Sequence, residues 1–250
     1  MQLKFKLFLS YFIFLLCLNS LAQSNELDLV NRTYDSLTEN LFTDYSGEIS
    51  ESSRIFNGPE YFYDDIIIGG NPFWGTRQFH NGSVFYEKVR YDNQEIGYDI
   101  YRDEIFISRY DQNGILSKIN LSDTKVDGFM MEGHTFIRLN EVPDEADHPG
   151  EGYYEVLLKG EGELNVIAKR SKRIMPANDG GLYKYEFQVS DKLYVQKDTI
   201  YQRIFNRKNL INLLKDKKKS IRTYYRNHKT EFLDLEDYVV GICSYYEQIK

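Results

Sequence analysis

The chain has little cysteine, and this limits what can hold its fold together. Of the two cysteines in 250 residues, Cys17 lies in an apolar N-terminal segment and Cys243 lies near the C-terminus. If the first segment is cleaved, the single remaining cysteine cannot form an internal disulfide. The fold must then be stabilised by its core, and the remaining length is enough to bury one. We interpret Cys243, within a hydrophobic stretch, as a buried small side chain.

Other absences exclude whole classes of protein. With 5 prolines and 17 glycines, the chain is neither collagen-like nor of low complexity. A hydrophobic content of 42% excludes disorder along the whole chain. Only one apolar run is long enough to consider as a membrane segment, so a polytopic membrane protein is excluded. A net charge of −7 argues against a general nucleic-acid binder.

The usual catalytic signatures are also missing from the sequence. It contains no G-x-S-x-G, H-E-x-x-H, G-x-G-x-x-G or C-x-x-C motif and no P-loop. None of its four histidines has a second histidine at ligand spacing. The carboxylates between residues 141 and 151 do not have EF-hand spacing and are interpreted as a solvated loop. We therefore predict no catalytic residue, no metal site and no cofactor; whether the protein is an enzyme stays open, with a non-catalytic role favoured.

The N-terminus has the pattern of a secretory signal. Lys4 and Lys6 precede the apolar run Leu7–Leu18, which is too short to cross a bilayer comfortably. Small residues at Ser20 and Ala22 then match a cleavage site. We predict a cleaved signal peptide over residues 1–22 and one globular domain over residues 23–250. The protein is expected to be exported, either periplasmic or associated with an outer membrane.

Most of the mature chain has the pattern of β-strands. Residues alternate in character along Val84–Tyr91, and β-branched and aromatic residues dominate Glu104–Tyr110. Turn signals such as Asn113-Gly114 separate such runs at short intervals. Strands recurring every 8 to 12 residues favour antiparallel pairing. We predict a mainly β body over residues 41–205, with about ten strands in an antiparallel sandwich or a barrel-like meander.

The spacing of apolar residues changes near the C-terminus from that of strands to that of helices. Asn206 can cap a helix over Arg207–Arg226, and Asp234 can cap a second one. Apolar residues recur at helical spacing in both segments. The sequence therefore predicts an α-helical hairpin over residues 206–248, packed against the β body.

Charge is unevenly distributed between these two parts. The segment 207–229 carries nine basic residues against one acidic residue, whereas residues 23–196 have a net charge of −14. Either the basic helix faces an anionic partner, such as a membrane surface or an acidic protein, or it is a solvated face that offsets the acidic body. The lack of aromatic residues within Lys217–Lys219 favours the second interpretation. The candidate residues for binding an anion or a partner are Lys215, Lys217, Lys218, Lys219, Arg222 and Arg226.

A glycine-rich aromatic loop offers a second candidate site. Phe73 and the only tryptophan, Trp74, follow Gly69-Gly70, and Tyr61 and Tyr63 precede them. Such rings could stack on a sugar or an apolar ligand. The alternative, which the sequence favours, is that Phe73 and Trp74 close one end of the β body.

Five stretches resemble uncharacterised exported proteins of Bacteroidota. They are Phe56–Tyr61, Tyr98–Ile100, Phe129–Leu139, Gly152–Gly160 and Lys208–Lys218. The resemblance spans most of the mature chain through short motifs. It implies a β-rich periplasmic or surface-associated protein and carries no assigned activity or catalytic residue.

Three functional hypotheses follow. The first is an exported non-catalytic protein, acting in the envelope through binding or structure, with an unknown protein or envelope partner. It would bind no nucleic acid and could contact an anionic membrane surface peripherally. The second is a carrier of a small apolar or sugar ligand, and the third is a hydrolase that uses carboxylates.

Overall fold

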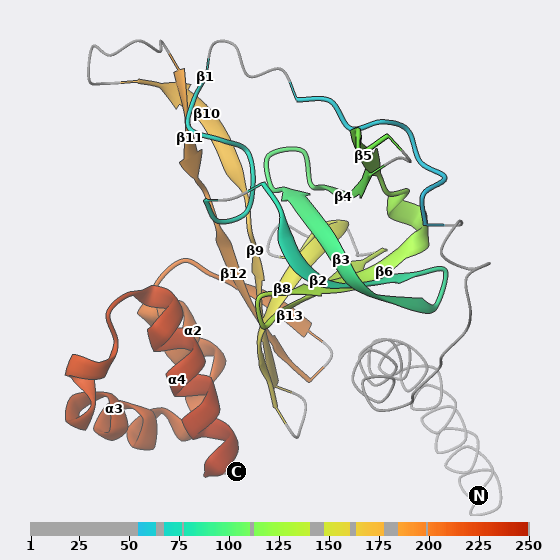
Figure 1. Cartoon of the computed structure of the whole chain (residues 1–250). Helices are drawn as coiled ribbons and strands as arrows, with labels where there is room; N and C mark the ends of the chain where they lie inside the picture. The colour runs from blue at the N-terminus through green and yellow to red at the C-terminus, as the bar shows by residue number, and fades with distance from the viewer. Residues whose placement is uncertain are drawn as a thin grey trace, which may run out of the picture. The chain divides into compact units, whose positions relative to one another are not determined.

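The computed structural model describes residues 55–63, 68–76, 78–110, 113–140, 148–160, 164–177, 185–198 and 200–249. The predicted signal peptide at residues 1–22 lies outside the described residues. So do residues 141–147 of the acidic loop. Figure 1 shows that β-strands form most of this part of the chain and that helices follow at the C-terminus.

Thirteen strands and three α-helices are found among the described residues. The strands are β1 (Ile68–Gly69), β2 (His80–Tyr86), β3 (Val89–Asp99), β4 (Glu104–Tyr110), β5 (Leu116–Asn120), β6 (Val126–Met131), β7 (His134–Leu139), β8 (Gly152–Lys159), β9 (Leu164–Lys169), β10 (Lys172–Pro176), β11 (Tyr185–Val189), β12 (Lys192–Lys197) and β13 (Ile200–Ile204). The helices are α2 (Arg207–Leu213), α3 (Lys218–Asn227) and α4 (Leu235–Gln248).

Ten of these strands form one antiparallel sheet. Its order is β13-β12-β9-β8-β7-β6-β2-β3-β4-β5. The prediction of a mainly β fold with a helical C-terminus is therefore confirmed. The closed form of the barrel-like alternative is not found, because the order begins at β13 and ends at β5 with no pairing between these two described strands.

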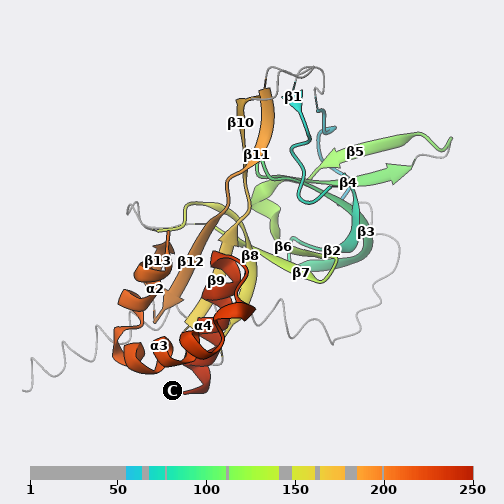
Figure 2. The same ribbon diagram turned by 90° about the vertical axis from the view of Figure 1, so that its left-hand side faces the viewer.

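The sheet is curled, although it is open. Four strand-to-strand steps separate β3 from β8, which would be about 19 Å in a flat sheet. The rings of Tyr98 on β3 and Tyr153 on β8 are nevertheless only 6.0 Å apart. Between them, Phe129 and Phe136 stack at 4.6 Å. The sheet thus wraps around an aromatic core. Figure 2 shows the curled course of β2, β3, β6 and β7.

The first hairpin corrects the prediction of a continuous strand over Val84–Tyr91. The chain turns at Glu87 and Lys88, which both have positive φ (50° and 64°). This geometry is typical of a two-residue hairpin turn, although neither residue is the usual glycine or asparagine. Contacts with a neighbouring loop hold the turn, since the Glu87 N–H donates to the Lys125 carbonyl at 2.7 Å. The position of this turn therefore depends on a contact from outside the hairpin and not on its own two turn residues.

Strands β9 and β12 continue, after a bend, into a smaller sheet. That sheet has the order β1-β11-β10, with β1 parallel to β11. At the bend, the Ser190 N–H donates to the Ser171 carbonyl, and the Ser171 N–H donates to Asp191. In Figure 1, β10 and β11 extend beyond β9 and β12 as one arm.

The helices α2 and α4 each begin directly after a residue whose side chain caps the helix. The side chain of Asn206 accepts hydrogen bonds from the N–H groups of Lys208 and Asn209, as predicted. Asp234 likewise accepts from the Asp237 N–H at the start of α4. The single helix predicted over Arg207–Arg226 is wrong in one respect. Leu214 leaves helical geometry (φ −97°, ψ 37°), and a 3-10 turn over Lys215–Lys217 separates α2 from α3.

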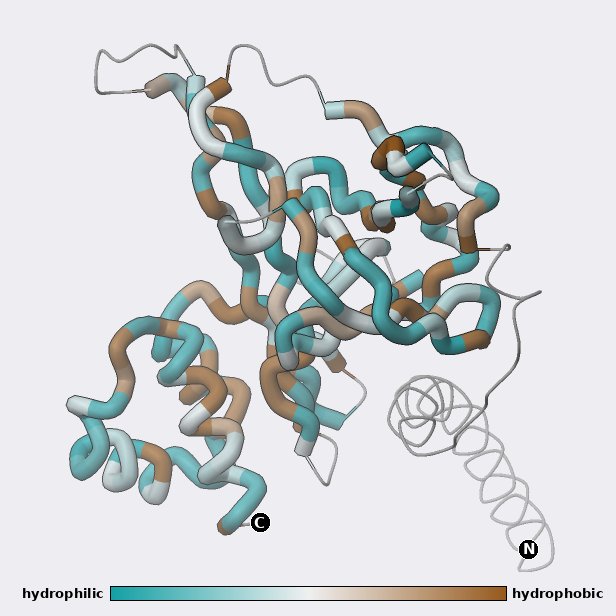
Figure 3. The backbone as a smooth tube through the Cα atoms, viewed as in Figure 1, coloured by the Kyte–Doolittle hydropathy of each residue, from teal (hydrophilic) through white to brown (hydrophobic). Residues whose placement is uncertain are grey.

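A second core lies between the helices and the strands β9, β12 and β13. It contains Val166 and Val195 from the sheet, together with Leu210, Ile221 and Ile242 from the three helices, all fully buried. Figure 3 shows hydrophobic and hydrophilic positions following one another along these helices, as an amphipathic pattern requires. Cys243 is buried in the same core, and burial raises the pKa of its thiol. Its predicted role as a small core side chain is confirmed.

Strand β8 serves both cores because of a register shift. Tyr153 packs in the aromatic core, whereas Leu157 and Leu158, neighbours in sequence, both pack against the helical core. Side chains at adjacent positions of a regular strand point to opposite faces. The shift between Val156 and Leu158 in the pairing with β9 permits both leucines to reach the same core.

Gly97 provides a test of the close packing outside the aromatic core. A Cβ atom on Gly97 would lie 2.2 Å from the Phe106 ring, which in turn stacks on Tyr61 with centroids 3.9 Å apart. We expect Gly97→Ala to lower the free energy of unfolding by about 1–3 kcal/mol, measured by urea denaturation. Gly150→Ala is the control, because no heavy atom lies within 4 Å of its added Cβ. Equal stability of the two variants would contradict this packing.

Candidate functional site

The basic segment forms a hollow of about 490 Å³ on the helical part. Seven residues line it: Lys215, Asp216, Lys218, Lys219, Arg222, Thr223 and Arg226. Five of the six basic residues predicted from the sequence are thus brought together in one place. Because Lys218, Arg222 and Arg226 are four residues apart, they share one face of α3.

The five basic side chains of the hollow are exposed and have no carboxylate partner among the residues that the structure describes. Among the described residues, no ion pair involves Lys215, Lys218, Lys219, Arg222 or Arg226. Like charges held close together repel one another, and an anion bound between them offsets this repulsion. The hollow therefore has a strongly positive lining that the rest of the described chain does not neutralise.

Asp216, the only acidic residue of the segment, is directed to other partners. Its two carboxylate oxygens accept hydrogen bonds from Lys197 Nζ at 2.8 Å and from the Tyr246 hydroxyl at 2.7 Å. Burial alone would raise the pKa of Asp216, but these two hydrogen bonds hold it below its usual value. Asp216 is therefore ionised and already paired, and it does not offset the five cations.

The opposite face of α3 fixes the helix against its neighbours. Ile221 is fully buried in the helical core. Tyr224 stacks on Tyr245 of α4, with ring centroids 4.0 Å apart. Lys217, the sixth predicted basic residue, lies outside the lining and donates to the Ile249 carbonyl at 3.1 Å. The cationic face is thus supported by a packed apolar face, and Lys217 joins α3 to the end of α4.

The aromatic residues predicted as a ligand site are divided between two clusters. Phe73 packs with Tyr61 and Tyr63, whereas Trp74 packs against Phe136 of the aromatic core. Tyr61 and Phe73 are buried, and Trp74 is half-buried. The two neighbours in sequence therefore do not present one continuous surface. Ligand binding at Trp74, Phe73, Tyr61 and Tyr63 stays a prediction.

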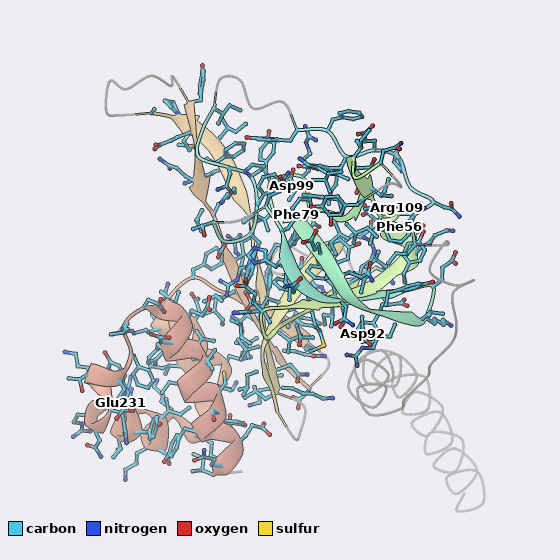
Figure 4. All side chains as sticks on the ribbon, in the orientation of Figure 1. Phe56, Phe79, Asp92, Asp99, Arg109 and Glu231 are labelled. Carbon is cyan, nitrogen blue, oxygen red and sulfur yellow. The ribbon has the colours of Figure 1, made fainter. Side chains whose placement is uncertain are left out.

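A buried carboxylate supports the first of these clusters. Asp99 accepts a hydrogen bond from the Tyr61 hydroxyl at 2.7 Å and two more from the N–H groups of Tyr101 and Arg102. Figure 4 labels Asp99 together with Phe79, which packs against Phe106 of the same cluster. With all three donors directed at Asp99, its carboxylate holds the loop after β3 against Tyr61.

A second buried carboxylate, Glu155, joins the sheet to the helices. It accepts hydrogen bonds from His134 Nδ1 and from Arg170 Nε. The Arg170 fork also binds both carboxylate oxygens of Glu236 on α4, at 2.7 and 2.8 Å, and contacts Asp191 at 2.9 Å. Burial alone would lower the pKa of Arg170, but the bonds to Glu236 and Glu155 raise it above its usual value. No sequence pattern predicts this network, because its members come from five separate segments.

Two other features, a cluster of metal ligands and a helix that could span a membrane, are not found among the described residues. Within these ranges, His, Cys, Asp and Glu side chains do not gather in threes as a metal ion would require. No helix in the described ranges is both long and apolar enough to span a membrane.

Comparisons with family models, with curated proteins and with solved structures returned no match. The resemblance to exported proteins of Bacteroidota therefore stays a prediction. Within the described residues, the side-chain chemistry of the hollow is the strongest functional indication.

The Arg170 network provides a stability test. Arg170→Met removes the cation but leaves Glu155 buried and Glu236 without its bidentate partner. We expect the free energy of unfolding to fall by about 3–5 kcal/mol in urea denaturation. Arg173→Met on the neighbouring strand β10 is the control, because Arg173 is exposed and its loss should change little. If both variants unfold at the same urea concentration, the network does not hold the helices to the sheet.

Proposed function

We propose that this protein is an exported, non-catalytic interaction protein of the cell envelope and that it binds an anionic partner on α3. Export is inferred from the signal-like segment 1–22, and binding from the hollow. The observation that supports the proposal is the gathering of five exposed basic side chains without a carboxylate partner among the described residues. Repulsion among them is relieved when an anion binds, which provides part of the binding free energy.

The distribution of charge supports the same role at longer range. The helical end of the chain is basic, whereas residues 23–196 have a net charge of −14. A protein with such separated charges is steered by the field of an anionic surface, with its basic part foremost. The acidic part is repelled by the same surface. This arrangement favours contact through the helices.

The packing of the curled sheet favours this proposal over a carrier of an apolar ligand. The inner side of β3, β6, β7 and β8 is filled by the rings of Tyr98, Phe129, Phe136 and Tyr153, which contact one another. A carrier needs space of several hundred Å³ for its ligand. The hollow on α3 has such a volume, but its lining suits an anion.

The proposal predicts salt-dependent binding to anionic membranes. The purified protein should sediment with vesicles that contain phosphatidylglycerol at low ionic strength, and not with phosphatidylcholine vesicles. Binding should weaken as the salt concentration rises, because the Debye length falls to about 8 Å at 0.15 M. Lys218→Glu with Arg222→Glu should reduce vesicle binding about tenfold or more.

The matched control is Lys208→Glu with Lys229→Glu. It makes the same change in net charge on exposed residues of the helical part, outside the hollow. It should reduce binding much less than the first pair. No vesicle binding at low salt, or an equal loss with both pairs, would overturn the proposal that α3 is the binding face.

A further inference from the structure

We propose that the hollow on α3 selects ligands that carry two or more phosphate groups. This inference rests on the proposed function, because it takes α3 as the binding face and names the chemistry that the face recognises. The phosphate groups can belong to a lipid head group or to a soluble polyphosphorylated molecule, because both carry the same charged groups.

The first argument is the amount of charge. Five basic side chains line the hollow, and Asp216 is held by Lys197 and Tyr246. A single carboxylate or sulfate monoester would leave most of this charge unmatched. A phosphate monoester carries about −1.5 to −2 at pH 7. Two such groups therefore supply about −3 to −4, close to the charge of the lining.

The second argument is the spacing of the cations along α3. Lys218, Arg222 and Arg226 lie on one face, and each step of four residues advances about 6 Å along the helix axis. The face therefore extends over about 12 Å between its first and last members. A single phosphate would require side chains from both ends of this face to converge on one point, which brings their like charges together. Two phosphate groups about 6–12 Å apart can each contact a basic side chain of their own.

The third argument is the kind of donor. Arg222 and Arg226 each present a planar fork of N–H groups, which matches two oxygens of one phosphate. Lys215, Lys218 and Lys219 supply compact charges that attract any anion. Such forks also match carboxylates, so the preference for phosphate comes from its higher charge of about −1.5 to −2 at pH 7, and the lysines add general attraction. The volume of about 490 Å³ is in the range of sites for small molecules.

The test compares two ligands with six anionic groups each, and one with a single group, by isothermal titration calorimetry with the full purified protein. The probes are inositol hexakisphosphate, benzenehexacarboxylate, and inorganic phosphate as a single group, all at one fixed ionic strength. We expect inositol hexakisphosphate to bind with one-to-one stoichiometry and at least tenfold more tightly than benzenehexacarboxylate. Inorganic phosphate should bind more weakly than either.

Arg222→Lys with Arg226→Lys keeps the charge and removes both forks. It should weaken binding of inositol hexakisphosphate at least fivefold and leave binding to phosphatidylglycerol vesicles unchanged. The reverse exchange, Lys218→Arg with Lys219→Arg, is the control and should not weaken either. All four positions are exposed, so these variants should fold normally.

Vesicles that contain cardiolipin, a lipid whose head group carries two phosphates, separate the two sources when they are compared with phosphatidylglycerol vesicles of equal phosphate content. Stronger binding to these vesicles than to phosphatidylglycerol vesicles indicates a lipid source, and binding of the soluble probe alone indicates a soluble one. Equal affinity for the hexaphosphate and the hexacarboxylate, or no effect of the arginine exchange, would overturn the inference while vesicle binding still supports the proposed function. Loss of all anion and vesicle binding would overturn both.

Discussion

The position of the helices depends on the cation of Arg170. This side chain lies at the end of β9, where the strand bends toward β10, and it contacts carboxylates from three other segments. Glu155 is buried in β8, and a buried carboxylate is costly unless it is paired and hydrogen-bonded. One guanidinium group pairs it and also binds Glu236 on α4. The sheet and the helical part are therefore joined by an interaction whose geometry permits little movement between them.

This junction matters for the hollow because α3 itself makes few direct contacts with the sheet. Its buried residue Ile221 and the stacked Tyr224 pack within the helical core, and α4 carries that core against β9. The Arg170–Glu236 pair fixes the first turn of α4, and Lys217 binds the carbonyl of Ile249 just after its last turn. The helix α4, against which α3 packs, is thus held at both of its ends. The cationic face of α3 therefore has a fixed position. A preorganised face loses less entropy when it binds a ligand than a mobile one.

The sequence predicts the elements well where local pattern decides them, and less well where distant contacts do. The strand over Glu104–Tyr110 and the caps at Asn206 and Asp234 follow from strand propensity and side-chain chemistry, and the structure has them at these positions. The turn at Glu87 and Lys88 could not be predicted, because a contact from Lys125 holds it. The basic residues of the candidate site were also visible as a cluster in sequence. Their common orientation was not, because it depends on the break at Leu214 that starts a new helix.

The charges at the contact between sheet and helices are the reverse of what the overall composition suggests. The sheet belongs to the acidic part of the chain and the helices to the basic part, so lysines of the helices would be expected to pair with carboxylates of the sheet. Among the described residues, however, both ion pairs that join the two parts have the cation on the sheet side and the carboxylate on the helical side, in Arg170–Glu236 and Lys197–Asp216. The acidic residues of the helical part thus hold it to the sheet. The cations of α3 take no part in this contact and remain available to an anion from outside the chain.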